Sequence, residues 1–233
     1  MTRFSTFLAL FSIAFLAQAL ADSLNARSLD HLNATQLLNL ELKTAITETQ
    51  RLSLLDNKDF VFNFLTSKTG VSMGDGGRTV AATAANFPAL IGHNIAMTVG
   101  FIGPCSINLP HIHPRATEIN FIAQGKFEAG FFEENGARFI VNTLHKGEVT
   151  VFPMGAIHFE QNLNCEPAVF VAAFNSEDPG VSTIGSNFIG GLPADIVSAS
   201  LRGLSIEQVK ELTKYLPKNP AIGIQECRKR CGL

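Results

Sequence analysis

The sequence predicts an all-β core with flanking helices, folded as a jelly-roll-like sandwich or β-barrel. From about residue 95 to residue 174, short runs rich in Phe, Ile, Val and Thr are separated by turn-forming residues. Strands that recur roughly every 8 to 12 residues are typical of antiparallel sandwiches and barrels. No helical pattern interrupts this stretch, which argues against a βαβ fold. Hydrophobic residues make up 46% of the chain and charged residues 16%, so the chain can bury a sizeable core.

The expected strands are separated by turn signals such as Glu134-Asn135-Gly136 and Lys146-Gly147. Before them, residues 57–90 have a mixed pattern with a glycine-rich turn at 74–77. We expect strands at 96–101, 118–123, 127–132, 138–144, 149–152, 157–163 and 169–174.

Helical patterns lie only before and after this core. Apolar residues are interleaved with charged residues over 34–53, and two more helices are expected at 193–201 and 205–216. Ser205 and Gln208 form a capping box at the start of the last helix. We expect these tail helices to cover a sheet edge or to join subunits. The predicted organisation is a signal peptide at 1–21, a helical extension at 22–57, the β-domain at 58–184 and a helical tail at 185–233.

The first residues have the order of features found in a secretory signal peptide. Arg3 precedes an apolar run at 7–16, and Ala19-Leu20-Ala21 then offers a small-x-small cleavage site. We therefore expect a secreted protein, with Asn33 in the acceptor sequon for N-glycosylation. No later segment has transmembrane length without charges or turn residues, so no membrane span is expected in the mature chain. The formal net charge of −2 gives no electrostatic basis for binding nucleic acid.

Histidines at strand spacing predict a metal site. His111 and His113 are two residues apart, so on a strand their side chains point to the same face. Glu118 and His158 would bring a carboxylate and a third imidazole from other strands. Such a set suits Mn, Fe, Co, Ni, Cu or Zn better than Ca or Mg. For any single histidine, a structural role is the alternative.

Two longer motifs surround these residues: the first contains His111, His113, Glu118 and Gly125, and the second contains Gly147, Pro153, Gly155, His158 and Asn162. They resemble the two signatures of the cupin family, and their surroundings resemble germins and germin-like, spherulin-type secreted cupins. The resemblance spans about residues 58 to 215 and implies a cupin jelly-roll β-barrel with one bound metal, often manganese. It implies that His111, His113, Glu118 and His158 are the metal ligands. It also implies an extracellular or cell-wall protein, and a homo-oligomer built through edge strands and C-terminal helices.

The first signature departs from the family at its opening glycine, which is Cys105 in this chain. In a cupin the strands that carry the two signatures pair antiparallel, which would bring Cys105 level with Cys165. We therefore expect a disulfide between them, given the secretory context. Cys227 and Cys231 would be left to pair with each other or with another chain, and the sequence does not decide between these.

The resemblance leaves the activity open. Some germins are oxalate oxidases, and others are reported as superoxide dismutases or have no known activity. Of the two asparagines thought to orient oxalate, Asn108 matches one, and Thr98 stands where the other falls. Asn162 is either a group that orients a metal ligand from outside or a turn residue.

Three functions are therefore considered. The first is a metal-dependent oxidoreductase that acts on superoxide or on a small-molecule carboxylate such as oxalate. The second is a non-catalytic extracellular coat or stress protein of spherulin type, with a structural metal. The third is a cupin isomerase or tailoring enzyme, against which the secretory signal weighs.

Overall fold

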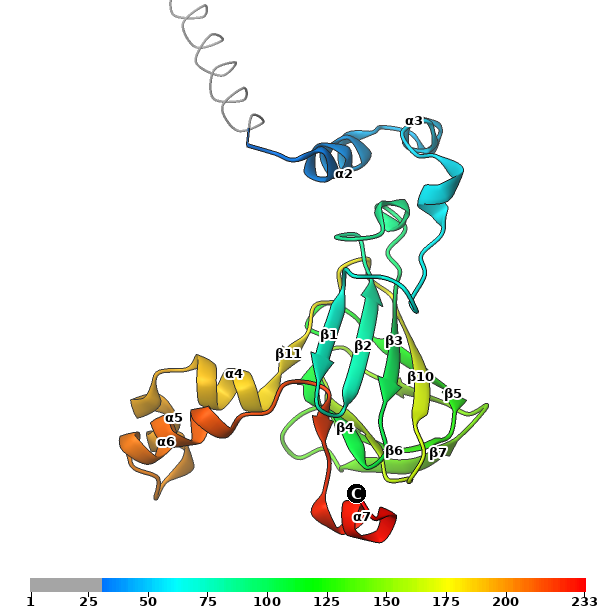
Figure 1. Ribbon diagram of the computed structural model, residues 1–233. Helices are drawn as coiled ribbons and strands as arrows, with labels where there is room; N and C mark the ends of the chain where they lie inside the picture. Colours follow the sequence, from blue (N-terminus) through cyan, green and yellow to red (C-terminus); the bar gives the residue numbers. More distant parts are fainter. Residues whose placement is uncertain (1–30) are drawn as a thin grey trace, which may run out of the picture. The chain divides into compact units, whose positions relative to one another are not determined.

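The computed structural model describes residues 31–233, and the chain divides into two units, the first ending at Leu55 and the second spanning Asp56–Leu233. The expected signal peptide at 1–21 lies outside the described residues. In the first unit, the sequence predicted one helix over 34–53, but the structure has α2 (Ala34–Thr44) and α3 (Glu48–Ser53) (Figure 1). The helix breaks because Ala45 is extended and Thr47 starts a new helix with its own capping box. No helix in the described part of the chain is long and apolar enough to cross a membrane.

The second unit is built on two antiparallel sheets that enclose one core (Figure 1). One sheet has the order β1-β2-β3-β10-β5-β8, and the other has the order β11-β4-β9-β6-β7, with β12 also paired to β4. The strands are β1 (Val71–Gly74), β2 (Gly77–Ala82), β3 (Ala96–Ile102), β4 (Ser106–Ile112), β5 (Glu118–Gln124), β6 (Lys126–Phe132), β7 (Ile140–His145), β8 (Val149–Phe152), β9 (Ile157–Asn162), β10 (Ala168–Phe174), β11 (Ser182–Thr183) and β12 (Ala221–Ile222). This confirms the expected all-β core with flanking helices.

The core lies between the sheets and follows the two-residue period of the strands. Along β10, alternate residues from Ala168 to Phe174 are buried, and Phe170 is 1% exposed. Gly100 lies opposite Phe170 in the β3–β10 pair. A Cβ on Gly100 would lie 2.2 Å from the Phe170 ring, so the glycine makes the room that this large side chain fills.

The expected strands are all present, with ends shifted by a residue or two. The sequence pattern did not predict β4 as a run, because Asn108 and Pro110 interrupt its apolar residues. Pro110 lacks a backbone N–H, and it lies where the β4–β9 register shifts between Asn108 and His111. The glycine-rich turn at 74–77 joins β1 to β2.

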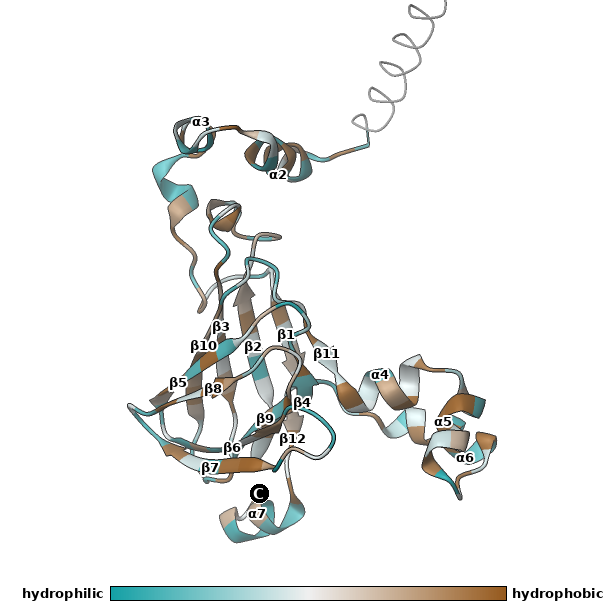
Figure 2. Cartoon of the chain, turned by 180° about the vertical axis from the view of Figure 1, so that it is seen from behind, coloured by the Kyte–Doolittle hydropathy of each residue, from teal (hydrophilic) through white to brown (hydrophobic). Residues whose placement is uncertain are grey.

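The C-terminal segment returns to the barrel after a helical excursion. The helices are α4 (Ile184–Gly191), α5 (Ala194–Leu201), α6 (Ile206–Leu212) and α7 (Gln225–Cys231), with short 3₁₀ turns at Asn57–Phe60, Pro88–Leu90 and Thr213–Tyr215. The capping box of Ser205 and Gln208 is confirmed at α6. Strands β11 and β12 both pair with β4, so the tail covers one edge of that strand. The last helix, α7, is largely hydrophilic (Figure 2).

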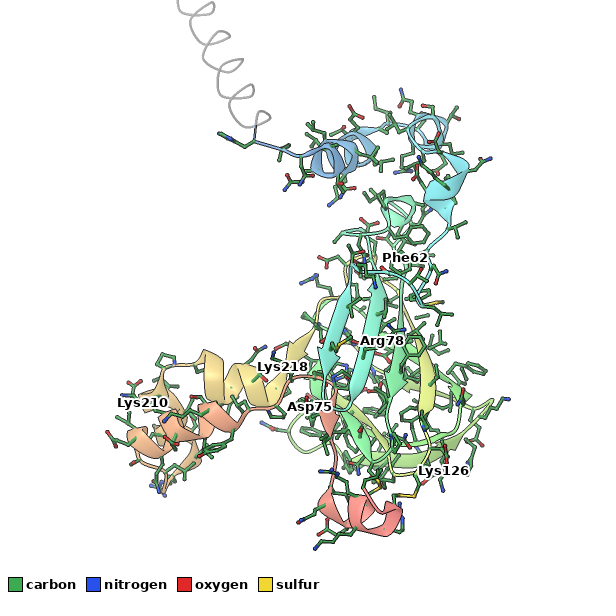
Figure 3. The ribbon with its side chains drawn as sticks, in the orientation of Figure 1. Phe62, Asp75, Arg78, Lys126, Lys210 and Lys218 are labelled. Carbon is green, nitrogen blue, oxygen red and sulfur yellow. A yellow bond between two sulfur atoms is a disulfide. The ribbon has the colours of Figure 1, made fainter. Side chains whose placement is uncertain are left out.

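The disulfides differ from the expected pairing. Cys105 bonds to Cys227 and Cys165 bonds to Cys231, so the prediction of a Cys105–Cys165 bond was wrong. The Cys105 backbone N–H donates to Asn164 O at 3.0 Å, so Cys165 lies one residue beyond this level. Cys227 and Cys231 are four residues apart on α7 and share a helix face, so each can form a disulfide with one cysteine of the barrel. Figure 3 draws disulfide sulfurs beside α7.

Candidate metal centre

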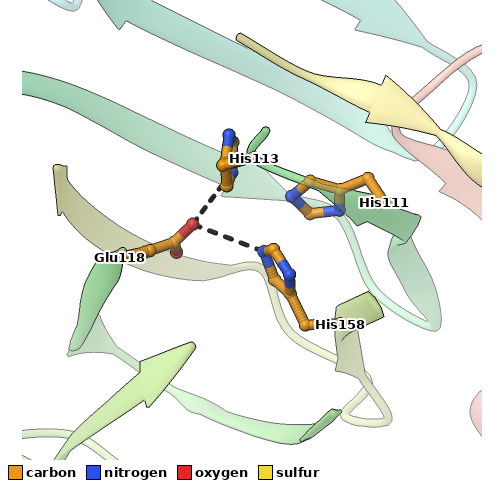
Figure 4. Close-up of side chains that lie close together, drawn as sticks. All are labelled: His111, His113, Glu118 and His158. Atoms are coloured by element: carbon orange, nitrogen blue, oxygen red, sulfur yellow. Dashed lines mark ion pairs between the residues drawn. The ribbon is translucent and has the colours of Figure 1, made fainter. Parts of the chain in front are cut away.

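Four buried side chains carried by both sheets meet inside the barrel (Figure 4). His111 lies near the end of β4 and His113 just after it, while Glu118 begins β5 and His158 lies on β9. The β4–β9 pairing places His111 directly opposite His158. The structure thus brings together all four residues that the sequence selected, with ligand atoms within 4.8 Å of one another.

Glu118 lies at the centre of the contacts in this group. Its Oε2 is 3.0 Å from His113 Nε2 and 3.4 Å from His158 Nε2. The ring centroids of His111 and His158 are 4.1 Å apart. All four side chains are at most 8% exposed, so water does not screen the charge of the carboxylate strongly.

Backbone carbonyls fix the tautomer of each imidazole. The Nδ1 atoms lie 2.8 Å from Leu109 O for His111, 2.5 Å from Gly180 O for His113, and 2.9 Å from Ala156 O for His158. A carbonyl oxygen can only accept, so each Nδ1 must carry its proton. The Nε2 atom of each neutral ring is then an unprotonated acceptor, and Figure 4 shows these rings around one point.

This arrangement fits a divalent cation. His158 Nε2 is buried, and no hydrogen-bond partner is found for it among the described residues. With lone pairs on three rings and one carboxylate facing each other, the group holds acceptors without a matching donor. A bound cation would satisfy all four, and nitrogen-rich ligands suit a transition metal better than Ca or Mg.

The charge states of His111 and Glu118 agree with a metal site. Burial, together with the neighbouring His158 and His113, lowers the pKa of His111 to about 3, so the ring is neutral as a ligand must be. Burial raises the pKa of Glu118, but the His113 and His158 imidazoles beside the carboxyl lower it by more, so the net pKa lies well below its usual range. The carboxyl is therefore an anion at neutral pH.

Buried polar side chains outside the ligands hold Glu118 in place. Asn120 donates from Nδ2 to Glu118 Oε1 and to Glu160 Oε1, both at 2.8 Å. Burial and the Glu118 charge raise the pKa of Glu160 well above its usual range. Sequence reasoning missed both residues, although each lies two positions after a ligand on a strand and so shares its inward face.

A cavity of about 300 Å³ opens beside the ligands. The expected substrate residues Thr98 and Asn108 both line it, together with Phe170 and Phe174. Among the residues that the structure describes, no Lys or Arg lines this cavity. A small ligand would therefore meet hydroxyls, amides and apolar walls around the metal ligands.

Asn162 is not brought to the metal ligands. It lies at the far end of β9 and donates from Nδ2 to Gly103 O at 2.8 Å and to Glu166 O at 2.9 Å. Its Oδ1 accepts from the backbone N–H of Asn164 at 2.9 Å. These contacts are those expected of a turn residue.

A glycine that sequence reasoning did not select also shapes the site. Gly180, whose carbonyl holds His113, has a φ of +67°, and a Cβ there would lie 2.8 Å from Arg115 Nη2. Arg115 pairs with Asp178 at 2.9 Å and so braces the same turn. The Asp178-Pro179-Gly180 string in the sequence was the available signal.

Comparison with known proteins gives consistent matches. Residues 62–210 match the family model described as Cupin. Spherulin-1A of Physarum polycephalum is 62% identical over 199 residues, which cover 85% of this chain and 80% of that protein. The probable germin-like protein subfamily 2 member 5 of Arabidopsis thaliana is 35% identical over 162 residues, which cover 69% of this chain and 75% of that protein. A solved structure of a recombinant oxalate oxidase in complex with glycolate matches with a TM-score of 0.63 and 26% identity, covering 69% of this chain and 82% of that chain.

Proposed function

Because the chain belongs to the cupin family, and within it to the germin and spherulin type, we propose that it is a secreted, manganese-dependent oxidoreductase. Its substrate is superoxide or a small carboxylate such as oxalate. The observation that carries the proposal is the convergence of His111, His113, Glu118 and His158 beside a cavity of about 300 Å³. A site that only stabilised the fold would need no such space next to its ligands.

The ligand residues would hold the ion through three Nε2 atoms and one carboxylate. When bound, manganese would supply redox exchange and positive charge to a small ligand. The protein's part is to keep the three rings neutral and aimed, which the carbonyls of Leu109, Ala156 and Gly180 support. Phe170 and Phe174 narrow the cavity and limit the water that reaches it.

Two reactions suit this cavity. Oxalate and dioxygen, with two protons, give two molecules of carbon dioxide and one of hydrogen peroxide. Two superoxide ions with two protons give dioxygen and hydrogen peroxide. Asn108 favours a small carboxylate as substrate, because its amide can donate to a carboxylate oxygen. Thr98 offers only a hydroxyl, whereas an amide at this position would have two N–H donors. The oxalate oxidase that matches this fold was solved with glycolate, itself a small carboxylate.

The wider setting of the proposal is extracellular. Disulfides persist in oxidising compartments, and the four cysteines of this chain form two of them. Asn33 is exposed at the start of α2 and has room for a glycan. We include in the proposal cleavage of the signal peptide at 1–21, glycosylation at Asn33 and assembly into a homo-oligomer.

A second candidate is a non-catalytic extracellular coat or stress protein with a structural metal. The identity of 62% to spherulin-1A favours it, as does the hydroxyl of Thr98 in place of an amide. Metal in that case would stabilise the fold without turnover.

Assays on purified, metal-quantified protein distinguish the two candidates. Peroxide release from oxalate and loss of superoxide are each measured against a His111→Ala, His113→Ala variant. A matched control is His145→Ala, which removes an imidazole that is 63% exposed and lies outside the ligand group. The proposal expects one of the two rates to persist in the control and to vanish in the double variant. Equal rates in the wild type and the double variant would defeat the enzyme proposal.

A further inference from the structure

The segment 217–224 runs from α6 back to the barrel and lies outside the region matched by the cupin family model, which ends at residue 210. We call it the C-terminal strap. Its strand β12 pairs with β4, and the α7 helix that follows it is tied to the barrel by two disulfides. The strap therefore lies beyond the matched region and is fixed to the strand that carries His111.

The strap lies in close contact with the β1–β2 turn. A Cβ on Gly74 would lie 2.2 Å from Pro220 O, and one on Gly76 would lie 2.0 Å from Ala221 O. The Gly76 backbone N–H donates to Pro220 O at 3.0 Å, and Figure 3 shows Lys218 beside Asp75 of the same turn. Only glycines allow this approach of the two backbones.

One strap side chain reaches the metal cavity. Asn219 lines the cavity together with Asn108. Asn219 Nδ2 donates to Asn108 Oδ1 at 2.6 Å, and the backbone N–H of Leu109 donates to Asn219 Oδ1 at 2.7 Å. Asn108 Nδ2 in turn donates to Glu160 Oε2 at 2.9 Å.

These hydrogen bonds have a fixed direction. The backbone N–H of Leu109 can only donate, so the oxygen of the Asn219 amide must face it. The Asn219 nitrogen then faces Asn108, whose own oxygen must accept. The Asn108 nitrogen therefore points toward Glu160 and the cavity, and one of its two hydrogens is donated to Glu160.

We propose that Asn219 is a positioning residue that holds the Asn108 amide with its nitrogen toward the metal cavity, so that the second N–H is available to an anionic oxygen. The inference rests on the proposed metal centre and deepens it, because it makes ligand binding depend on a segment outside the family domain. Asn108 touches the ligand, and Asn219 acts only through Asn108.

The test uses Asn219→Asp in the full-length, manganese-loaded protein. The new carboxylate still accepts from Leu109 but cannot donate to Asn108, so the Asn108 amide turns its nitrogen to the strap and its oxygen to the cavity. Lys218→Ala is the matched control, since it makes the same change of one charge on the neighbouring strap residue, whose side chain is exposed. The probe is oxalate, and its dissociation constant is measured by calorimetry and by the electron paramagnetic resonance signal of the bound manganese.

We expect Asn219→Asp to weaken oxalate binding by about 10-fold or more relative to Lys218→Ala, the scale of one hydrogen bond to a charged group. Metal content stays equal in the two variants. In a double-mutant cycle, Asn219→Asp has no further effect once Asn108→Ala is present. A second variant, Asn219→Ala, also removes the donor to Asn108 and gives the same ranking if the first does not fold.

Three results would overturn the inference: oxalate affinity in Asn219→Asp within about twofold of the control, additive effects in the cycle, or loss of manganese together with oxalate. Because binding rather than turnover is measured, wild-type protein that binds oxalate but neither oxidises it nor removes superoxide would defeat the enzyme proposal and leave this inference standing.

Discussion

The two disulfides that hold α7 give a prediction whose size can be worked from the topology. The Cys105–Cys227 bond spans 122 residues and the Cys165–Cys231 bond spans 66. The bonds overlap along the chain, so with either one in place the other closes a ring of about 65 residues. Removing one bond therefore costs about 4 kcal/mol of unfolding free energy whichever bond is chosen, and removing both costs about 9 kcal/mol.

The variants are Cys165→Ala with Cys231→Ala, and Cys105→Ala with Cys227→Ala. Alanine avoids placing a hydroxyl at Cys105 and Cys227, which are 0% and 1% exposed. Unfolding is followed by denaturant titration and by thermal melting, where 4 kcal/mol corresponds to a loss of about 8 to 16 °C in a domain of this size. Mass analysis without reductant checks that the remaining bond has formed.

The reasoning is wrong if the two variants differ in stability in proportion to the sequence spans of their lost bonds. It is also wrong if either loss leaves the melting temperature within about 3 °C of the wild type, since the ring-closure term would then be absent. In that case α7 would be held by packing rather than by its disulfides.

Three further predictions concern the site and the core. Asn120→Ala removes the amide that donates to Glu118 Oε1, and it should weaken manganese binding by about 10- to 100-fold in a chelator competition. An unchanged manganese affinity would contradict a role for Asn120 in holding the carboxylate. In folded, metal-free protein the buried His111 has a pKa of about 3 and stays neutral as the pH falls. In the unfolded chain the same histidine takes up a proton below about pH 6.5. The free energy of unfolding therefore falls by about 1.4 kcal/mol per pH unit from about pH 6.5 down to about pH 3. Denaturant titrations across this range should give a slope that is smaller by this amount in His111→Gln, and an equal slope would refute the assignment. Gly100→Ala places a Cβ 2.2 Å from the Phe170 ring and should cost about 1 to 3 kcal/mol, part of which Phe170→Leu restores; additive losses would contradict the contact.

The parts of the fold that follow from local pattern were predictable from the sequence. The strands from 96 onward alternate in hydrophobicity and end at glycine or proline turns, so their positions were expected to within a residue or two. Strand β4 was not expected as a run, because its interior carries Asn108 and Pro110, which serve the cavity and the register shift. The helix predicted over 34–53 failed for a local reason, since Thr47 caps a second helix.

The metal ligands were predictable because their spacing matches two family motifs. Residues at these motif positions come together in the folded domain although they lie far apart in the chain. The disulfide pairing was not predictable, because it depends on where α7 docks, which no local pattern of the chain encodes. Asn219 was beyond sequence reasoning for the same reason, since it meets Asn108 across 111 residues of chain. Asn120 and Glu160 could have been found, because a polar residue two positions from a ligand on a strand shares its buried face.

The central claim is that His111, His113, Glu118 and His158 hold a single transition-metal ion. Elemental analysis of protein purified from its native source tests it most directly, beside a Glu118→Gln, His158→Ala variant whose folding is checked by circular dichroism. The predicted result is close to one manganese or other divalent transition-metal ion per chain in the wild type and less than about a tenth of that in the folded variant. Metal-free wild-type protein, or equal metal content in the two proteins, would contradict the claim.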